Sequence, residues 1–211
     1  MPIATKPSQF DSINKFALEI TGDKIISFGS LHPYMDEPVK ALKSLKEAGI
    51  SGIKLHPEFQ SFYIDCGQSI EIIKKAHELD MWVMLHTGND IGLPPPCHCT
   101  PSMLKNLLNY VSGEKIIAAH LGGWELWDEV YDKLCGTPIY MDTAFIADFI
   151  DKKLCEKIIE KHGADKILFG SDSPWENPAH TEDFINSLDI SEKDKEKIKY
   201  KRADGIDLTA T

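Results

Sequence analysis

The sequence predicts an α/β protein in which short parallel strands alternate with helices. Short apolar runs without polar alternation recur along the chain of 211 residues, which is typical of parallel strands buried on both faces. Segments with helical periodicity lie between these runs, and side chains that can bind metals recur where the runs end. The first two observations predict a parallel sheet covered by helices. The third indicates where functional residues lie.

Six apolar runs are the expected strands. Each run is short and mostly apolar, and it stops at small or polar residues, as in "KILFGSDSPW" (166–175). Because the runs do not alternate between polar and apolar residues, we expect both faces of the sheet to be covered. The expected strands are residues 24–30, 52–56, 82–86, 115–120, 138–142 and 166–172.

Four segments carry the signals of helices. Residues 36–49 place apolar side chains on one face and stop at Gly49. Thr100 is an expected N-cap, and Pro101 follows it at the first helical position. The expected helices are residues 8–20, 36–49, 100–113 and 148–163.

Composition favours one domain over residues 1–211 and excludes several function classes. The formal charge is −10 and no long basic cluster is present, so we expect no nucleic-acid partner. No apolar run approaches the roughly 20 residues of a membrane span. The first stretch, "MPIATKPSQF", lacks the apolar core of a signal peptide. We therefore expect a cytoplasmic protein without a membrane partner.

The five cysteines are scattered through the chain, and their odd count favours reduced thiols over a disulfide framework. The segment "PCHCT" (96–100) has some character of a metal knuckle, but no second pair of ligands accompanies it. We do not expect a separate metal site in this segment, and the role of His98 stays open.

The placement of polar residues distinguishes a closed barrel from an open, doubly wound sheet. Both folds fit alternating strands and helices, but no Gly-rich phosphate loop follows any expected strand. His56, His86, His120, Asp142 and Asp172 stand at the carboxyl ends of five strands. In a barrel these ends meet at one mouth, where active sites are built. A turn role would also explain either aspartate alone, but the repetition favours a barrel.

Four of these strand ends resemble motifs of the amidohydrolase superfamily. "GIKLHP", "VMLHTG", "AAHLGGW" and "ILFGSDSPW" are similar to its fourth, fifth, sixth and eighth strand motifs. The resemblance is closest to the amidohydrolase-related group, which includes small-molecule hydrolases, lactonases and non-oxidative decarboxylases. It implies a TIM-barrel-like fold with one or two divalent metals, commonly zinc, at the mouth.

The resemblance assigns roles to three residues. His86 matches the metal ligand of the fifth strand, and Asp172 matches the carboxylate of the eighth strand, a ligand and general base. His120 matches a histidine that assists the chemistry or binds a second metal. Imidazole and carboxylate groups suit zinc, and an open coordination position allows the metal to acidify water.

Four further residues are expected to contact the substrate. Lys54 falls near the position where some members carry a carboxylated lysine between two metals, and it could equally bind an acidic substrate. His56 is two residues further on, so both side chains face the same side of the strand. Trp124 and Trp175 follow mouth loops, where they could close over a ligand or pack beneath the loops.

The chain departs from the family pattern at its start. Counted back from the eighth-strand motif, residues 24–30 are the third strand and residues 1–5 the tail of the second. The first strand and its His-x-His metal ligands are absent, so we expect an incomplete, N-terminally truncated barrel with a weakly held metal. Its two open edges predict a homodimer, because the "KRADGID" portion of the tail at 199–211 is too polar to replace a buried strand.

The first functional hypothesis is a metal-dependent hydrolase, in which metal-activated water attacks a small-molecule amide, ester or lactone. An alternative is a non-oxidative decarboxylase or hydratase on the same scaffold. A third hypothesis, from another class, is a non-catalytic fragment that binds no metal. The fold and the metal ligands are shared across many reactions, so they do not specify the substrate.

Overall fold

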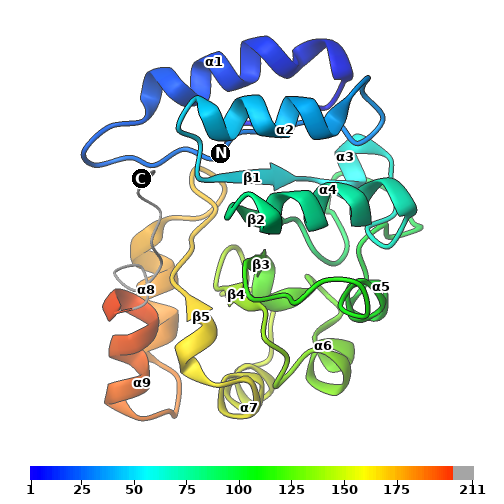
Figure 1. Ribbon diagram of the computed structural model, residues 1–211. Coiled ribbons are helices and arrows are strands. Elements are labelled where there is room, and N and C mark those ends of the chain that lie inside the picture. Colours follow the sequence, from blue (N-terminus) through cyan, green and yellow to red (C-terminus); the bar gives the residue numbers. More distant parts are fainter. Residues whose placement is uncertain (202–211) are drawn as a thin grey trace.

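The computed structural model describes residues 1–201, and its centre is a parallel sheet of five strands (Figure 1). Each strand pairs with the next one along the chain, in the order β1-β2-β3-β4-β5. Gly52 lies opposite Trp82 at the start of the first pair, and Met141 lies opposite Ile167 in the last. The strands are β1 (Gly52–Leu55), β2 (Trp82–Leu85), β3 (Ile116–Ala118), β4 (Tyr140–Asp142) and β5 (Ile167–Leu168).

The strand order confirms the predicted fold class. A doubly wound sheet reverses its strand order at one point, and ligands bind there. In this sheet the order never reverses, so the chain winds in one direction with a helical connection between successive strands, as in a TIM barrel.

The prediction of a strand at residues 24–30 was wrong, because this segment does not form a regular strand. Only Gly29 joins the sheet: its N–H donates to Gly52 O at 3.0 Å, and its carbonyl accepts the N–H of Lys54 at 2.8 Å. Earlier in the segment, Gly22 and Ile25 exchange backbone hydrogen bonds in a local antiparallel bridge. Ile25 is 54% exposed, so this part of the run lacks the burial on both faces that would extend it into a strand.

Helices surround the sheet in Figure 1. Short 3-10 or π-helical turns lie at Pro7–Gln9, His120–Gly122, Ala164–Lys166 and Lys197–Lys201. The α-helices are α1 (Phe10–Ile20), α2 (Pro38–Glu47), α3 (Pro57–Gln60), α4 (Gly67–Glu78), α5 (Pro101–Leu107), α6 (Trp127–Lys133), α7 (Lys152–His162), α8 (Pro178–Asn186) and α9 (Glu192–Glu196).

The four expected helices are present as α1, α2, α5 and α7, with shorter bounds. Thr100 caps α5 as predicted, because its hydroxyl accepts the N–H of Met103 at 3.2 Å. The helix ends at Leu107, well before Gly113, and turns follow it. Gly49 has φ +91°, a left-handed conformation that ends the segment containing α2.

Two apolar layers lie on opposite faces of the sheet. The larger one packs the strands against the helices and includes Ile53, Leu55 and Val83. A smaller cluster of Phe28, Trp82 and Ile117, with Met84, Tyr140 and Leu168 packed against it, fills the inner face. Because side chains alternate along a strand, the inner positions of β1 and β2 lead to polar residues at the carboxyl ends of these strands. This arrangement positions the site.

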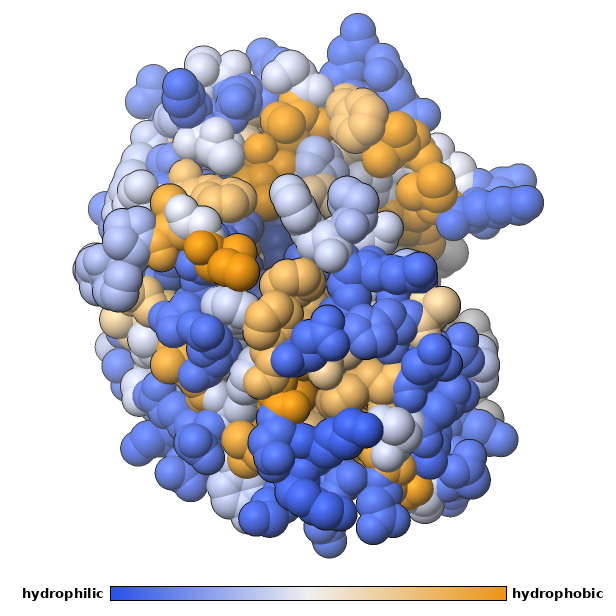
Figure 2. Space-filling view, turned by 180° about the vertical axis from the view of Figure 1, so that it is seen from behind, coloured by the Kyte–Doolittle hydropathy of each residue, from blue (hydrophilic) through white to orange (hydrophobic). Residues whose placement is uncertain are grey.

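Figure 2 shows patches of apolar side chains among polar ones on the face opposite that of Figure 1. Within residues 1–201, no helix is long and apolar enough to cross a membrane. The predicted homodimer stays a prediction, and residues 202–211 of the tail on which it partly depends lie outside the described residues.

Candidate active site

Three predicted histidines come together at the carboxyl ends of neighbouring strands. His56 follows β1, His86 follows β2 and His120 lies just after β3. The rings of His56 and His86 stack with centroids 4.1 Å apart, and those of His86 and His120 meet edge to face at 4.8 Å. Nε2 of His120 is 3.1 Å from Nδ1 of His86. These three side chains are buried, so they form a compact polar layer beneath the mouth.

Backbone groups fix the orientation of His120. Its Nδ1 contacts the carbonyl of Ala144 at 2.9 Å, so this nitrogen carries the hydrogen. Its backbone N–H donates to Oδ1 of Asp142 at 2.9 Å, and the same oxygen accepts the N–H of Ala144 at 3.0 Å. The buried carboxylate of Asp142 therefore holds the turn that carries His120 through these two hydrogen bonds. The turn role that we considered for Asp142 accounts for both contacts.

Asp90 completes the group, and the sequence analysis missed it. Its Oδ2 lies 3.6 Å from Nε2 of His56 and 3.8 Å from Nε2 of His86. Donor atoms of the three residues all lie within 4.8 Å of one another, the only such group of three or more His, Cys, Asp or Glu found in residues 1–201. Asp90 stands four residues after His86 in "HTGND", a loop position without a strand pattern. Two imidazoles and a carboxylate at this spacing fit a divalent metal.

The environment favours the neutral forms of His56 and His86. Burial lowers the pKa of His86 well below its usual value, and the nearby His56, His120 and Lys54 lower it further. Burial, followed by the charge of Lys54 and of His120, lowers the pKa of His56 to about 3. A neutral imidazole has a lone pair that can bind a metal.

Lys54 lies on the inner face of β1, paired in register with Met84 of β2. Burial is the main cause that lowers the pKa of its ammonium group, while the charges of Asp142 and Asp172 act in the opposite direction. Within residues 1–201, Lys54 has no salt bridge with a carboxylate at 4.0 Å or less. Its amino group therefore lacks a close carboxylate partner among the described residues.

Asp172 lies apart from the buried group. It is exposed, its φ is +60°, and it is absent from the three-residue donor group around His86. Its charge acts on Lys54, so it belongs to the same mouth. Its role as a metal ligand stays a prediction.

The two tryptophans have different environments. Trp124 is only 5% exposed and packs against the rings of Phe145 and Phe149, with centroids 6.3 and 5.3 Å away. Trp175 is 77% exposed. Trp124 is therefore packed beneath a loop and also lines a pocket beside Asp90, while Trp175 is free to contact a ligand at the surface.

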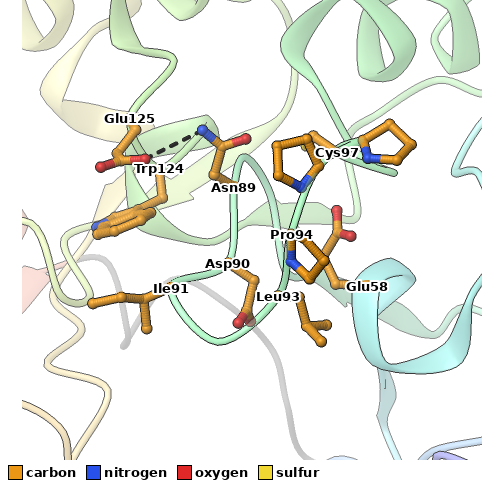
Figure 3. Close-up of a pocket in the computed structure, with 11 residues that line it drawn as sticks. Glu58, Asn89, Asp90, Ile91, Leu93, Pro94, Cys97, Trp124 and Glu125 are labelled. Atoms are coloured by element: carbon orange, nitrogen blue, oxygen red, sulfur yellow. Dashed lines mark hydrogen bonds between the residues drawn. The ribbon is translucent and has the colours of Figure 1, made fainter.

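A pocket of about 300 Å³ opens beside Asp90 (Figure 3). Loops that follow β1, β2 and β3 form it, so it lies at the same end of the sheet as the histidines. In Figure 3, Asn89 bridges toward Glu125, and Nδ2 of Asn89 is 3.2 Å from Oε2 of Glu125. The lining residues are Glu58, Asn89, Asp90, Ile91, Leu93, Pro94, Pro95, Pro96, Cys97, Trp124 and Glu125.

The "PCHCT" segment forms one wall of this pocket through Cys97. Glu58 is buried and accepts both the backbone N–H and the ring Nδ1–H of His98, each at 2.5 Å. Cys97 donates its thiol hydrogen to Gly88 O, and burial raises its pKa to about 11. Burial also raises the pKa of Cys99. Both are neutral thiols, and all five cysteines of the chain are free.

Comparison with known proteins identifies the family. A family model described as amidohydrolase matches residues 4–203, which is most of the chain. The chain therefore belongs to the amidohydrolase family, and on that membership we class it as a metal-dependent enzyme.

Three relatives illustrate the range of the family. A gamma-resorcylate decarboxylase from Polaromonas sp. strain JS666 is 29% identical over 82% of this chain and 67% of its own length. The structure of a dihydroxybenzoic acid decarboxylase from Polaromonas sp. JS666, with manganese and 2-nitroresorcinol bound, matches with a TM-score of 0.65 and 20% identity, over 94% of this chain and 74% of that one. A Pseudomonas putida protein with a proposed 2-pyrone-4,6-dicarboxylic acid hydrolase activity matches with a TM-score of 0.65 and 16% identity, over 92% and 76% of the two chains.

The structure of the dihydroxybenzoic acid decarboxylase contains manganese, and this supports a divalent metal in the present protein. The similarity does not extend to zinc, so the zinc expected from the sequence stays a prediction.

Proposed function

We propose that this protein is a metal-dependent decarboxylase that removes CO2 from a small hydroxylated aromatic acid. The observation that carries the proposal is the unpaired Lys54, whose ammonium group is close enough to His56 and His86 to lower their pKa values. A cation without a close anion, beside a buried group of histidines, suits the carboxylate of a substrate. Two of the three relatives described above are decarboxylases of such acids, which supports the same substrate class.

In the proposed reaction, His120 first takes up a second proton at Nε2, and this imidazolium then gives that proton to the ring carbon that carries the carboxylate. The bond from that carbon to the carboxylate then breaks, its electron pair returns to the ring, and CO2 leaves. Because Nδ1 of His120 is held by Ala144, Nε2 is the nitrogen that exchanges the proton. Nε2 contacts His86 at 3.1 Å, so the substrate must displace this contact when it binds.

The bound divalent metal would act as a Lewis acid on substrate oxygens, and His86 is the residue best placed to hold it. Lys54 would bind the substrate carboxylate, and the apolar side of the pocket, including Ile91 and Leu93, would contact the ring. Manganese is the metal to test first, because carboxylate and carbonyl oxygens suit it, with zinc as the alternative from the sequence.

The test is CO2 release from 2,6-dihydroxybenzoate, a compound bound by one structural relative, using protein loaded with Mn²⁺. Replacing the acid in His120→Asn should lower kcat about 10²- to 10⁴-fold. Lys54→Met should mainly raise KM, whereas Lys153→Met, a matched change at a lysine 69% exposed on α7, should leave both constants unchanged. If no hydroxylated aromatic acid in a substrate panel releases CO2, the proposal fails.

Hydrolysis is the second candidate. Asp172 lies exposed at the mouth, where a carboxylate could accept a proton from attacking water, and one structural relative has a proposed hydrolase activity. The same protein should then open 2-pyrone-4,6-dicarboxylate, and Asp172→Asn should abolish this activity. Lactone opening without CO2 release would favour the hydrolase.

A further inference from the structure

The group of His56, His86 and Asp90 differs from the ligand set that the resemblance implies, which combines His86 with Asp172. We infer that His86 and Asp90 are this chain's own ligands for a divalent metal, and that His56 holds the Asp90 carboxylate in position. The inference rests on the proposed function for the role of the metal but not for its binding, so the two can be tested separately.

A count of hydrogens supports a cation beside His86. Three contacts run in a row: Ala144 O to Nδ1 of His120, Nε2 of His120 to Nδ1 of His86, and Nε2 of His86 to Asn89 O at 3.2 Å. The row ends in a carbonyl at each side, so it needs three hydrogens if every contact is a hydrogen bond. Two neutral imidazoles supply only two. The row is complete when a further proton or a metal ion occupies the last contact, between Nε2 of His86 and the oxygens it faces, and the oxygens decide between the two.

The oxygens at that contact are those a divalent metal would use. Asn89 O and Oδ2 of Asp90 lie 3.2 and 3.8 Å from Nε2 of His86. The other carboxylate oxygen of Asp90 accepts the N–H of Gly92 at 2.8 Å, which fixes the side chain in its loop. An imidazole, a carboxylate and a carbonyl oxygen favour a metal such as Mn²⁺. Water or substrate would complete its coordination.

His56 differs from His86 in its tautomer. Its Nδ1 accepts the backbone N–H of Phe59 at 3.3 Å, so in the neutral ring Nε2 carries the hydrogen. This Nε2 faces Oδ2 of Asp90 at 3.6 Å. A nitrogen that carries a hydrogen cannot bind a metal, but it can steady a carboxylate that does. We therefore assign His56 as a positioning residue.

The experiment measures Mn²⁺ binding to the full chain by electron paramagnetic resonance of free Mn²⁺, after treatment with a chelator. Asp90→Asn keeps the acceptor for Gly92 and should weaken binding at least 10-fold. Asp90→Glu, which keeps a carboxylate, should bind better than Asp90→Asn. Asp189→Asn is the control, since it removes a charge from a side chain that is 90% exposed and outside the donor group, and should bind within 2-fold of wild type.

Three further variants separate the roles. Asp172→Asn should bind Mn²⁺ within 3-fold of wild type. His56→Gln retains an N–H donor and should bind better than His56→Leu, and urea unfolding of both will show whether loss of the Phe59 contact unfolds the chain. The inference is overturned if the wild type does not bind Mn²⁺ at millimolar concentration, if Asp90→Asn binds like wild type, or if Asp172→Asn loses as much affinity as Asp90→Asn. Metal binding without CO2 release would refute the proposed function alone.

Discussion

Acid should destabilise this protein through His162, a buried histidine in the last turn of α7 that is only 7% exposed. Its Nε2 donates to Ile139 O at 3.1 Å, and its Nδ1 accepts the N–H of Gly136 at 3.3 Å. Protonation of Nδ1 would break the second bond inside the core. Burial is the main cause that lowers the pKa of His162 from 6.5 to about 4.

The sign and size of the effect follow from this shift. The unfolded chain takes up the proton near pH 6.5 and the folded chain only near pH 4, so stability is lost as the pH falls through this window. For one such group, the free energy of unfolding should fall by about 2 kcal/mol between pH 7 and pH 5. His56, with a pKa of about 3, should add a loss of the same sign.

Urea unfolding at several pH values tests this prediction, with wild type compared with His162→Gln. The glutamine can form similar hydrogen bonds but does not titrate, so the variant should lose about 2 kcal/mol less than wild type between pH 7 and pH 5. An NMR titration of the His162 ring should place its pKa near 4. Equal losses in both proteins would refute the reasoning.

Three further predictions concern stability and assembly. Gly88→Ala should prevent folding or lower the free energy of unfolding by several kcal/mol, because the added Cβ would lie 2.0 Å from the backbone nitrogen of Trp124. At Gly136 no atom lies within 4 Å of the added Cβ, so Gly136→Ala should cost about 1 kcal/mol, for the positive φ alone. Urea unfolding midpoints of the two variants test this difference. Thr100→Ala should cost about 1 kcal/mol by loss of the α5 cap, and Thr100→Ser should restore most of it in the same assay. Light scattering over a dilution series should show a homodimer, and a stable monomer at every concentration would contradict the open-edge argument.

Much of the fold could be predicted because buried parallel strands leave a strong sequence signal. Five of the six apolar runs form strands, and the helices between them lie where periodicity and end signals indicate. The strand bounds were too long, as in β5, which ends at Leu168 whereas the expected run extended to residue 172. The strand prediction for residues 24–30 failed because an apolar run predicts burial on both faces. The local bridge between Gly22 and Ile25 leaves Ile25 exposed instead.

The candidate site could be predicted only in part, for a physical reason. The carboxyl ends of parallel strands converge, so residues placed there, such as His86 and His120, are brought together by the fold itself. Asp90, Glu58 and His98 lie in loops or a short helix, and their positions depend on tertiary contacts that no local pattern encodes. The pairing of Glu58 with His98 joins residues 40 positions apart. No spacing rule in the sequence indicates it.

The loop that carries Asp90 is fixed by backbone hydrogen bonds that continue the pairing of β2 with β3. Gly88 forms a parallel bridge with Trp124, beyond the ends of β2 and β3. Trp124 N–H donates to Thr87 O at 2.9 Å, and its carbonyl accepts the N–H of Asn89 at 3.0 Å. The left-handed φ of Gly88, +87°, and its lack of a side chain allow this close approach. Asp90 therefore follows a backbone fixed on both sides, and this explains how a loop carboxylate can face His86 at a defined distance, as a metal ligand must.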